Sequence, residues 1–401
     1  MRLLFADSLD ESRLSSLRDA GHEVIVDAGL GADDLPGAIG GIDVLVVRST
    51  KVTAETIEAA DQLGLIVRAG AGTDNVDKVA ASAKGIYVCN VPGQNAVAVA
   101  ELTMGLLLAI DRHLADGAAD LRNGVWNKKK YTKADGVYGK TMGIIGLGDI
   151  GMAVAERAKA FGLTVIAERK HGRAPATLQR IRSIGIQLVD SRDELLAQSD
   201  VVSIHVPKSD GTIGMVDSAF LAALPDRAIV LNTSRGDIVV AEDLIAAMDE
   251  RGIRAGLDVY PGEPASATAD FESALASHPN VVGSHHIGAS TSQAQDAVAA
   301  GTIQVVEAYA AGDVVNCVNL VKEPLGTCVL VIRHEDEVGV LAKVFAVLRQ
   351  RGLNIQQMQN QLFSANGAAV ATINVEGTVD TECLDALADI HEVIDVRVSG
   401  C

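Results

Sequence analysis

The stretch GIIGLGDIG at residues 143–151 decides the fold of the central part of this 401-residue chain. Its glycines, Gly146, Gly148 and Gly151, have G-x-G-x-x-G spacing, and they stand between an apolar run and the helix-like stretch MAVAERAKAF. In this context the first glycine permits a tight turn and the second leaves room for a pyrophosphate. The helix N-terminus then supplies amides and a dipole that hold the phosphates. The stretch therefore predicts a strand, a turn and a helix that bind a dinucleotide.

The strand after this helix, LTVIAE at 163–168, should end beside the adenosine ribose of the dinucleotide. An acidic residue usually stands there, but this chain has Arg169, with Lys170 close behind and Glu168 one residue early. The two cations favour the 2′-phosphate of NADP, whereas Glu168 turned inward would bind the ribose of NAD. We expect NAD as the cofactor, and the sequence leaves NADP open as the alternative.

Apolar, β-branched runs alternate with helical stretches on both sides of the glycine loop, which predicts parallel βαβ units. Five such runs lie between residues 2 and 91, and a second series continues from residue 140 to residue 284. Residues 95–116 predict one long, buried helix between the two series. After Pro324 the pattern changes to a small βαββαβ module. The sequence therefore predicts an α/β protein with two parallel-sheet domains and a third, smaller domain.

Charge and composition exclude several classes of function. The formal net charge is −18, which repels nucleic acid and anionic lipid, so a small anionic substrate would need a local basic pocket. The longest apolar stretch, residues 102–110, is too short to cross a membrane, and the acidic N-terminus does not resemble a secretory signal. We therefore expect a cytoplasmic protein. The five cysteines lack the paired spacing of zinc ligands, and no metal site is predicted.

Three stretches of the second series carry residues suited to redox chemistry on a hydroxy acid: NTSRGDIV (232–239), GLDVYPGEP (256–264) and SHHIGAST (284–291). Each follows an apolar strand, and ligands of open α/β sheets bind beyond the carboxyl ends of the strands. An arginine can clamp a carboxylate, an acid can orient an imidazole, and a histidine can move a proton. Together with nicotinamide as hydride acceptor, these groups would suffice to oxidise an α-hydroxy acid.

With RAGAGTDNVD (68–77) and NVPGQNAVAVAEL (90–102), these motifs make the chain resemble the D-isomer-specific 2-hydroxyacid dehydrogenases over nearly its whole length. Within that family it is similar to the members that carry a C-terminal ACT domain and oxidise D-3-phosphoglycerate to 3-phosphohydroxypyruvate. That reaction is the first step of L-serine biosynthesis. The resemblance implies an enzyme, an oxidoreductase of amino-acid biosynthesis, that forms a homodimer or homotetramer.

The resemblance also implies a domain arrangement. Residues 1–96 and 287–324 would form a discontinuous, flavodoxin-like substrate-binding domain. Residues 97–286 would form a Rossmann-like dinucleotide-binding domain inserted in it, so that both domains are doubly wound parallel sheets. Residues 325–401 would form the regulatory ACT domain.

The family's catalytic residues fall on three positions of this chain. Arg235 would bind the substrate carboxylate and α-oxygen, and His286 would take the hydroxyl proton as the hydride leaves. Glu263 would hydrogen-bond the other ring nitrogen of His286 and hold one tautomer. His285 stands where many relatives have proline, and we assign it no role.

Binding residues follow from the same resemblance. The predicted cofactor contacts are Gly146, Gly148, Asp149, Ile150, Gly151, Arg169, Val206, Thr233, Ser234, Asp258 and Gly288. The predicted substrate contacts are Arg48, Ser49 and Lys51 near the phosphate and Arg68 and Gly70 near the carboxylate. A basic face that is simply solvated remains the other reading of the lysines in these clusters.

The terminal module contains RHEDEVGVLAKVF (333–345) and RGLNIQQM (351–358), which resemble an ACT domain. His334, Asp336 and Asn354 fall where serine-binding members have their ligand contacts, which implies L-serine as an effector. Asp336 replaces an amide residue, and Val338 replaces a proline, so a purely dimerising role stays open.

Two other functions stay open at this point. A reductase of hydroxypyruvate, glyoxylate or another 2-keto acid would use the same chemistry, and the arginine at position 169 favours it. A regulator that senses nucleotides with a dehydrogenase fold would need cofactor binding but no proton shuttle. The set of Arg235, Glu263 and His286 disfavours that second alternative.

Overall fold

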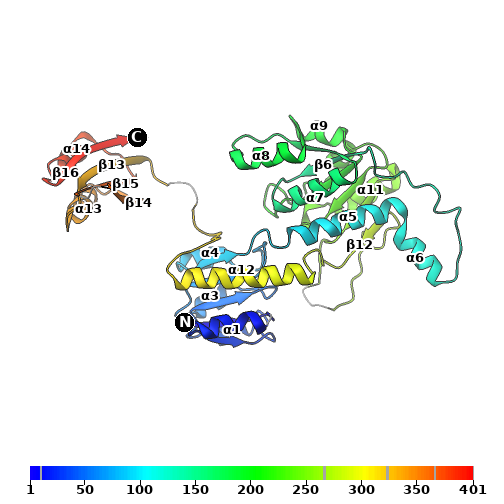
Figure 1. The fold of residues 1–401 in the computed structure, drawn as a ribbon, viewed down its shortest axis with the longest axis horizontal. Helices are drawn as coiled ribbons and strands as arrows, with labels where there is room; N and C mark the ends of the chain where they lie inside the picture. The colour runs from blue at the N-terminus through cyan, green and yellow to red at the C-terminus, as the bar shows by residue number, and fades with distance from the viewer. Residues whose placement is uncertain (10, 265–267, 322–324, 365–366, 401) are drawn as a thin grey trace. The chain divides into compact units, whose positions relative to one another are not determined.

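The computed structural model of this chain describes residues 1–9, 11–264, 268–321, 325–364 and 367–400. These residues contain three sheets, and the chain divides into two compact units, Met1–Val318 and Asn319–Cys401 (Figure 1). The first two sheets lie in the first unit. The predicted domain boundary between residues 324 and 325 and the predicted end at residue 401 involve positions outside the described residues, and the exact boundaries stay predictions.

The first sheet has five parallel strands in the order β2-β1-β3-β4-β5. Its strands are β1 (Arg2–Phe5), β2 (Glu23–Val26), β3 (Val44–Val47), β4 (Leu65–Arg68) and β5 (Tyr87–Asn90). This order is that of flavodoxin-like sheets, as the sequence predicted. Strands β1, β3 and β4 are buried almost throughout because helices cover both faces.

Two groups of helices sandwich this sheet. One face packs against α2 (Leu35–Ala38), α3 (Ala54–Ala59) and α4 (Lys78–Ala83). The other face packs against α1 (Glu11–Asp19) and α12 (Ser292–Ala310). Helix α12 returns from far along the chain and contacts α1, β4 and β5, and Figure 1 shows it among the helices of the first sheet, so this domain is discontinuous in sequence.

The second sheet has seven parallel strands in the order β12-β11-β10-β9-β6-β7-β8. Its strands are β6 (Thr141–Ile145), β7 (Thr164–Glu168), β8 (Gln187–Val189), β9 (Val201–Ile204), β10 (Ile229–Asn232), β11 (Arg254–Leu257) and β12 (Val281–Gly283). The strand order reverses between β6 and β9, which is the topological switch point of a Rossmann-like sheet. The predicted doubly wound fold is therefore confirmed.

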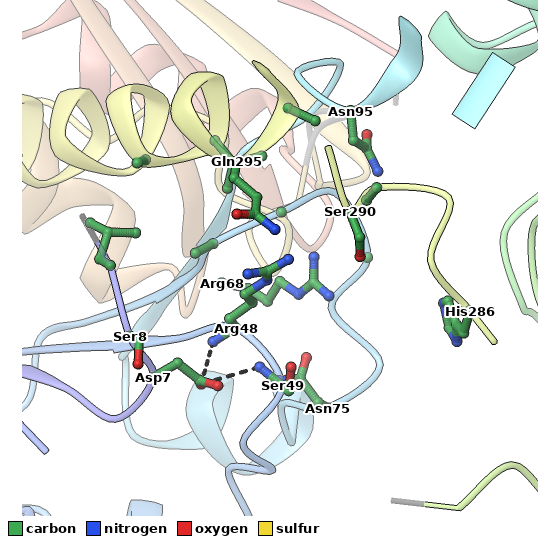
Figure 2. A pocket seen from close by; sticks show the side chains of 18 of the residues that line it. Asp7, Ser8, Arg48, Ser49, Arg68, Asn75, Asn95, His286, Ser290 and Gln295 are labelled. Carbon is green, nitrogen blue, oxygen red and sulfur yellow. Dashed lines mark hydrogen bonds between the residues drawn. The ribbon is translucent and has the colours of Figure 1, made fainter. Parts of the chain in front are cut away.

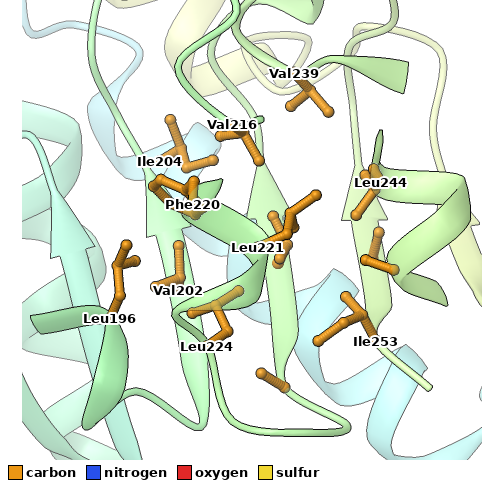
Figure 3. Close-up of a cluster of buried hydrophobic side chains, with 14 of the residues drawn as sticks. Leu196, Val202, Ile204, Val216, Phe220, Leu221, Leu224, Val239, Leu244 and Ile253 are labelled. Atoms are coloured by element: carbon orange, nitrogen blue, oxygen red, sulfur yellow. The ribbon is translucent and has the colours of Figure 1, made fainter. Parts of the chain in front are cut away.

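Helices cover both faces of the second sheet as well. Helices α5 (Ala96–Arg112), α7 (Asp149–Ala160) and α8 (Pro175–Ile184) pack on one face. Helices α9 (Arg192–Ala197), α10 (Ser218–Ala222) and α11 (Ala241–Arg251) pack on the other, and a short 3-10 turn, η1 (Gly236–Ile238), follows β10. Figure 3 shows the latter core, where Val202 and Ile204 of β9 meet Phe220 and Leu221 of α10. Aliphatic side chains supply most of this packing, in keeping with an aromatic content of 3%.

The single helix predicted over residues 95–116 is wrong at its C-terminal end. Helix α5 ends at Arg112 because His113 adopts a left-handed conformation with φ of 53°, and α6 (Leu114–Arg122) begins directly after it. The His113 amide bonds to the carbonyls of Ala109 and Ile110, which caps α5. Apolar periodicity continues across such a cap, so the sequence pattern did not reveal the break.

The second unit is a four-stranded antiparallel sheet in the order β14-β15-β13-β16, with two helices on one face. Its elements are β13 (Cys328–Glu335), α13 (Val340–Gln350), β14 (Asn354–Leu362), β15 (Ala368–Glu376), α14 (Thr381–Ala388) and β16 (Val393–Ser399). The predicted βαββαβ module is confirmed. Within the residues that the structure describes, no helix is long and apolar enough to cross a membrane.

Candidate active site

The glycine loop after β6 has the geometry that a dinucleotide requires. Gly146 has φ of +99°, and a Cβ there would lie 2.4 Å from the His205 carbonyl oxygen, so only glycine fits. A Cβ on Gly151 would lie 2.0 Å from the Gly146 carbonyl oxygen, which keeps α7 close to the turn. A Cβ on Gly148 would meet no atom of the chain within 4 Å. The space beside Gly148 and the N-terminus of α7 therefore fits a pyrophosphate.

The arginine predicted near the ribose is engaged by a neighbouring loop. The Arg169 Nε lies 2.9 Å from Asp190 Oδ1, and the Arg169 amide donates to the Val189 carbonyl. Arg173 donates to the Glu168 carbonyl. Arg169 and Asp190 are both largely exposed, at 52% and 83%, so this ion pair is weak and leaves the choice between NAD and NADP to other evidence.

The predicted catalytic residues Arg235, Glu263 and His286 all line one pocket of about 910 Å³. They follow β10, β11 and β12, three adjacent parallel strands whose carboxyl ends lie at one edge of the second sheet. His286 Nδ1 lies 2.7 Å from Glu263 Oε2, and Glu263 Oε1 accepts from the Tyr260 amide at 2.6 Å. A carboxylate can only accept, so Nδ1 carries the proton and Nε2 is left as the acceptor.

The hydrogen bond between Glu263 and His286 shifts the pKa values of both side chains. The hydrogen bond to Glu263 raises the pKa of His286, against the opposing effect of burial. Burial alone would raise the pKa of Glu263, but the hydrogen bonds from His286 and the Tyr260 amide outweigh it, and the net pKa is lowered. The pair is thus built to stabilise an imidazolium beside a carboxylate, which suits a histidine that accepts a proton.

A buried carboxylate shapes the turn that carries His286. Asp258 is 1% exposed and accepts from the Ile287 amide, the Gly288 amide and the Ser284 hydroxyl at 2.7 to 2.8 Å. The Asp258 carbonyl accepts from the His286 amide at 2.8 Å. These bonds hold His286 at φ of 53°, a conformation that costs about 1–2 kcal/mol for a residue with a side chain. The predicted cofactor contact of Asp258 stays a prediction, and both of its carboxylate oxygens already hold the turn.

The first sheet contributes positive charge to the same pocket. Arg48 and Arg68, from the ends of β3 and β4, line it (Figure 2), and Arg235 is a third arginine among the lining residues. Burial, then the charges of Arg235 and Arg48, lowers the pKa of Arg68 to about 10. Three guanidinium groups that line one pocket indicate a site built for a multiply charged anion.

Asp7 was not predicted, although it stands directly beyond β1, beside β3. Its Oδ2 accepts from the amides of Arg48, Ser49 and Thr50 at 2.6, 3.1 and 3.3 Å, as Figure 2 shows in part. The turn after β3 is therefore held by Asp7, and the amides of Arg48, Ser49 and Thr50 are not free to bind an anion in the pocket. The rule that ligands meet the carboxyl ends of strands could have identified Asp7 from the sequence.

The sequence did not predict four further residues that line the pocket: Asp74, Asn95, Ser290 and Gln295. Figure 2 shows Gln295, from the first turn of α12, near the two arginines. No local motif marks a single polar side chain at a helix start, so its place depends on how α12 returns to the first sheet.

Some of the remaining predicted contact residues line the pocket, and others do not. Ser49 and Gly70 line the pocket, whereas Lys51 is exposed and is not among its lining residues. Val206, Thr233 and Ser234 follow β9 and β10 at the same sheet edge as the glycine loop. Their contacts with a cofactor, like those of Asp149, Ile150 and Gly288, stay predictions.

The predicted effector residues do not meet within one copy of the second unit. His334 is 2% exposed, with hydrogen bonds from its ring to the Glu335 carbonyl and the Asn360 side chain. It pairs with Ala369, whereas Asn354 pairs with Glu376 at the other end of β15. Asp336 is exposed directly after β13. The antiparallel register therefore separates Asn354 from the other two.

Comparison with known proteins adds independent evidence. Residues 104–288 match the family described as D-isomer specific 2-hydroxyacid dehydrogenase, NAD binding domain, which supports NAD as the cofactor, while the domain bounds 97–286 stay a prediction. Residues 330–397 match the AHAS small subunit-like ACT domain. The chain is 41% identical over 335 residues to D-3-phosphoglycerate dehydrogenase of Methanocaldococcus jannaschii, covering 81% of this chain but only 61% of that protein. It thus spans less than two thirds of that relative's length.

Two further proteins match over nearly their full length. Hydroxypyruvate reductase of Thermotoga maritima is 41% identical over 303 residues, which cover 75% of this chain and 94% of that protein. The solved structure of NAD+-bound 3-phosphoglycerate dehydrogenase of Entamoeba histolytica has a TM-score of 0.64 and 27% identity, and it covers 80% of this chain and 99% of its own. The family match, the 41% identity to relatives, the flavodoxin-like first sheet and the Rossmann-like second sheet all agree. This chain belongs to the D-isomer-specific 2-hydroxyacid dehydrogenase family.

Proposed function

We propose that this protein oxidises D-3-phosphoglycerate to 3-phosphohydroxypyruvate with NAD, the entry step to L-serine. The observation that carries the proposal is the convergence of Arg48, Arg68 and Arg235 on the pocket that contains the His286–Glu263 pair. Phosphoglycerate has both a phosphate and a carboxylate, so it has enough negative charge for three guanidinium groups. The similarity to the M. jannaschii enzyme supports the same substrate.

The proposed mechanism divides the work among these side chains. Arg235 binds the carboxylate and the α-oxygen, Arg68 lies near the carboxylate, and Arg48 binds the phosphate. His286 Nε2 accepts the proton of the C2 hydroxyl, and Glu263 stabilises the resulting imidazolium through Nδ1. NAD, bound at the glycine loop, supplies the acceptor for the hydride that leaves C2. The reductase direction uses the same groups with the proton returned from His286.

A test of the substrate compares D-3-phosphoglycerate with unphosphorylated D-glycerate. Arg48→Gln should raise KM for phosphoglycerate about 10- to 100-fold, the worth of charge-assisted hydrogen bonds, and leave KM for glycerate unchanged. Arg13→Gln removes an exposed arginine of α1 outside the pocket and should change neither. Equal kcat/KM for the two substrates in the unaltered protein would contradict a phosphate-binding role.

The second candidate function is a hydroxypyruvate or glyoxylate reductase. The T. maritima relative favours it, because it matches at the same identity and over 94% of its length. The test measures the reverse reaction with hydroxypyruvate and with 3-phosphohydroxypyruvate. A kcat/KM for hydroxypyruvate equal to or above that for the phosphorylated substrate would favour this candidate. A regulator that only senses nucleotides is disfavoured by the 2.7 Å contact between His286 and Glu263, which such a protein does not need.

We also propose that the ACT domain responds to L-serine and that the protein is a homodimer or homotetramer acting in the cytoplasm. L-Serine should lower the rate of the full chain several-fold and leave a chain that ends at Leu325 unaffected. Initial-rate assays of both proteins at rising serine concentration measure this difference. If serine changes the rates of both proteins equally, the ACT domain has a purely dimerising role. In that case the full chain should have a larger oligomeric mass in solution than the chain that ends at Leu325.

A further inference from the structure

Asp74 makes a direct contact with Arg235 across the pocket. Asp74 lies in the loop after β4 of the first sheet, and Arg235 follows β10 of the second. Asp74 Oδ2 accepts from Arg235 Nε at 2.8 Å, although 161 positions separate the two residues in sequence. Both side chains line the pocket and are partly exposed, at 46% and 32%. The contact therefore joins the loop after β4 of the first sheet to the arginine that follows β10 of the second sheet.

The hydrogen bonds of Arg235 fix the orientation of its guanidinium plane. A guanidinium has five N–H donors in one plane. Here Nε donates to Asp74, and Nη1 donates to the Ser234 carbonyl at 2.7 Å. Because both hydrogen bonds must be kept, the guanidinium plane cannot rotate about the Nε–Cζ direction. Among the residues that the structure describes, the three other N–H groups, one on Nη1 and two on Nη2, make no hydrogen bond, and they form the edge that can meet a carboxylate bidentately.

Gly72 makes room for the same guanidinium. A Cβ on Gly72 would lie 2.0 Å from Arg235 Nη2 and 3.3 Å from Cζ. Gly72 and Asp74 are two residues apart in one loop, so one supplies the space and the other the anchor. The backbone of Gly72 does not need the left-handed region, and the space alone explains the glycine.

From this geometry we propose that Asp74 is a positioning residue, which aims the Nη1–Nη2 edge of Arg235 at the carboxylate of a 2-hydroxy acid. The inference rests on the proposed function, because Arg235 is taken to bind that carboxylate. Asp74 also offsets part of the repulsion among the three arginines of the pocket. The opposite role, in which Asp74 competes with the substrate for Arg235, predicts an effect of opposite sign.

Calorimetric binding to the full chain separates these roles, with three ligands: D-3-phosphoglycerate, D-lactate and inorganic phosphate. Asp74→Asn should weaken both hydroxy acids about tenfold and leave inorganic phosphate unchanged, since phosphate needs no oriented Arg235. Asp74→Glu should recover part of the loss. Gly72→Ala should reproduce the loss by displacing the guanidinium from the other side. Asp226→Asn breaks an ion pair of the same type, Arg251 Nε to Asp226 Oδ1 at 2.8 Å, outside the pocket, and should have no effect.

A double variant tests whether Asp74 acts through Arg235. In an Arg235→Gln background, Asp74→Asn should cause no further loss of phosphoglycerate affinity, which a merely structural role would not predict. Unchanged or tighter binding of the hydroxy acids in Asp74→Asn would overturn the proposal, as would an equal loss of phosphate affinity.

The same data distinguish failure of this inference from failure of the proposed function. If the unaltered protein binds phosphoglycerate but forms no NADH, the function is wrong while the binding comparison still decides the role of Asp74. If the unaltered protein binds neither hydroxy acid, Arg235 holds no carboxylate and the inference about Asp74 is wrong too.

Discussion

Replacing His286 with alanine is expected to lower kcat for oxidation of the 2-hydroxy acid by about 10²–10⁴-fold, the usual contribution of a positioned general base. Without the imidazole, the pocket has no acceptor for the hydroxyl proton at the place that Glu263 now fixes. The affinity for NAD should be unchanged, because the glycine loop lies on other strands of the sheet. Steady-state kinetics and calorimetric titration with NAD measure the two quantities.

The matched control for this variant is His285→Ala. His285 is the adjacent residue, it is exposed, and it is not among the residues that line the pocket. Its removal should leave kcat within about twofold of the unaltered protein, as for exposed residues without a partner. A His286→Ala protein that keeps more than a tenth of the rate would show that another group takes the proton.

The pH profile of the same reaction provides a second measurement of this prediction. His286 must be neutral to accept a proton, so the oxidation rate should rise with pH through the His286 pKa. That pKa is raised by Glu263, so the midpoint should lie above the ordinary histidine value of about 6.5. Glu263→Gln removes the charge that raises the pKa, so the midpoint should move to lower pH while kcat falls. A midpoint that does not move would mean that another group titrates.

Replacing Gly148 with valine is expected to abolish NAD binding, with Kd raised about 100-fold or more, while the fold is kept. A Cβ at this position meets no atom of the chain within 4 Å and the backbone has φ of −83°, so a residue with a Cβ is compatible with the folded backbone. It fills instead the space through which a pyrophosphate approaches the backbone. Titration with NADH should show the loss, and the midpoint of thermal unfolding should change by no more than a few degrees.

Gly151→Ala is the structural counterpart of this variant. There the Cβ would lie 2.0 Å from a backbone carbonyl oxygen, so the helix and turn must move apart. We expect a loss of about 1–3 kcal/mol in the free energy of unfolding, as in other overpacked sites. If Gly148→Val lowers stability as much as Gly151→Ala does, the open space at Gly148 is not a ligand site.

Much of the fold could be predicted from the sequence because its signals are local. Alternating apolar runs and helices predicted the parallel sheets, and the glycine spacing predicted the turn before α7. The same motifs placed Arg235, Glu263 and His286 after three successive strands, and parallel pairing of those strands brought them to one edge. The break at His113 was missed, since a left-handed cap at a histidine leaves the apolar pattern intact.

By itself, then, the sequence determined most of the strands and helices and the position of the glycine loop. The family resemblance that it carries named Arg235, Glu263 and His286, whose catalytic role stays a prediction. Only the tertiary structure decided the pairings between distant residues. Asp7 reaches the amides after β3, Asp74 reaches Arg235, Lys51 stays outside the pocket, and the register of β14 and β15 separates Asn354 from His334. The physical reason is that local propensity acts over a few residues, whereas a side chain's partner depends on which sheet edges and helices the packed cores bring together.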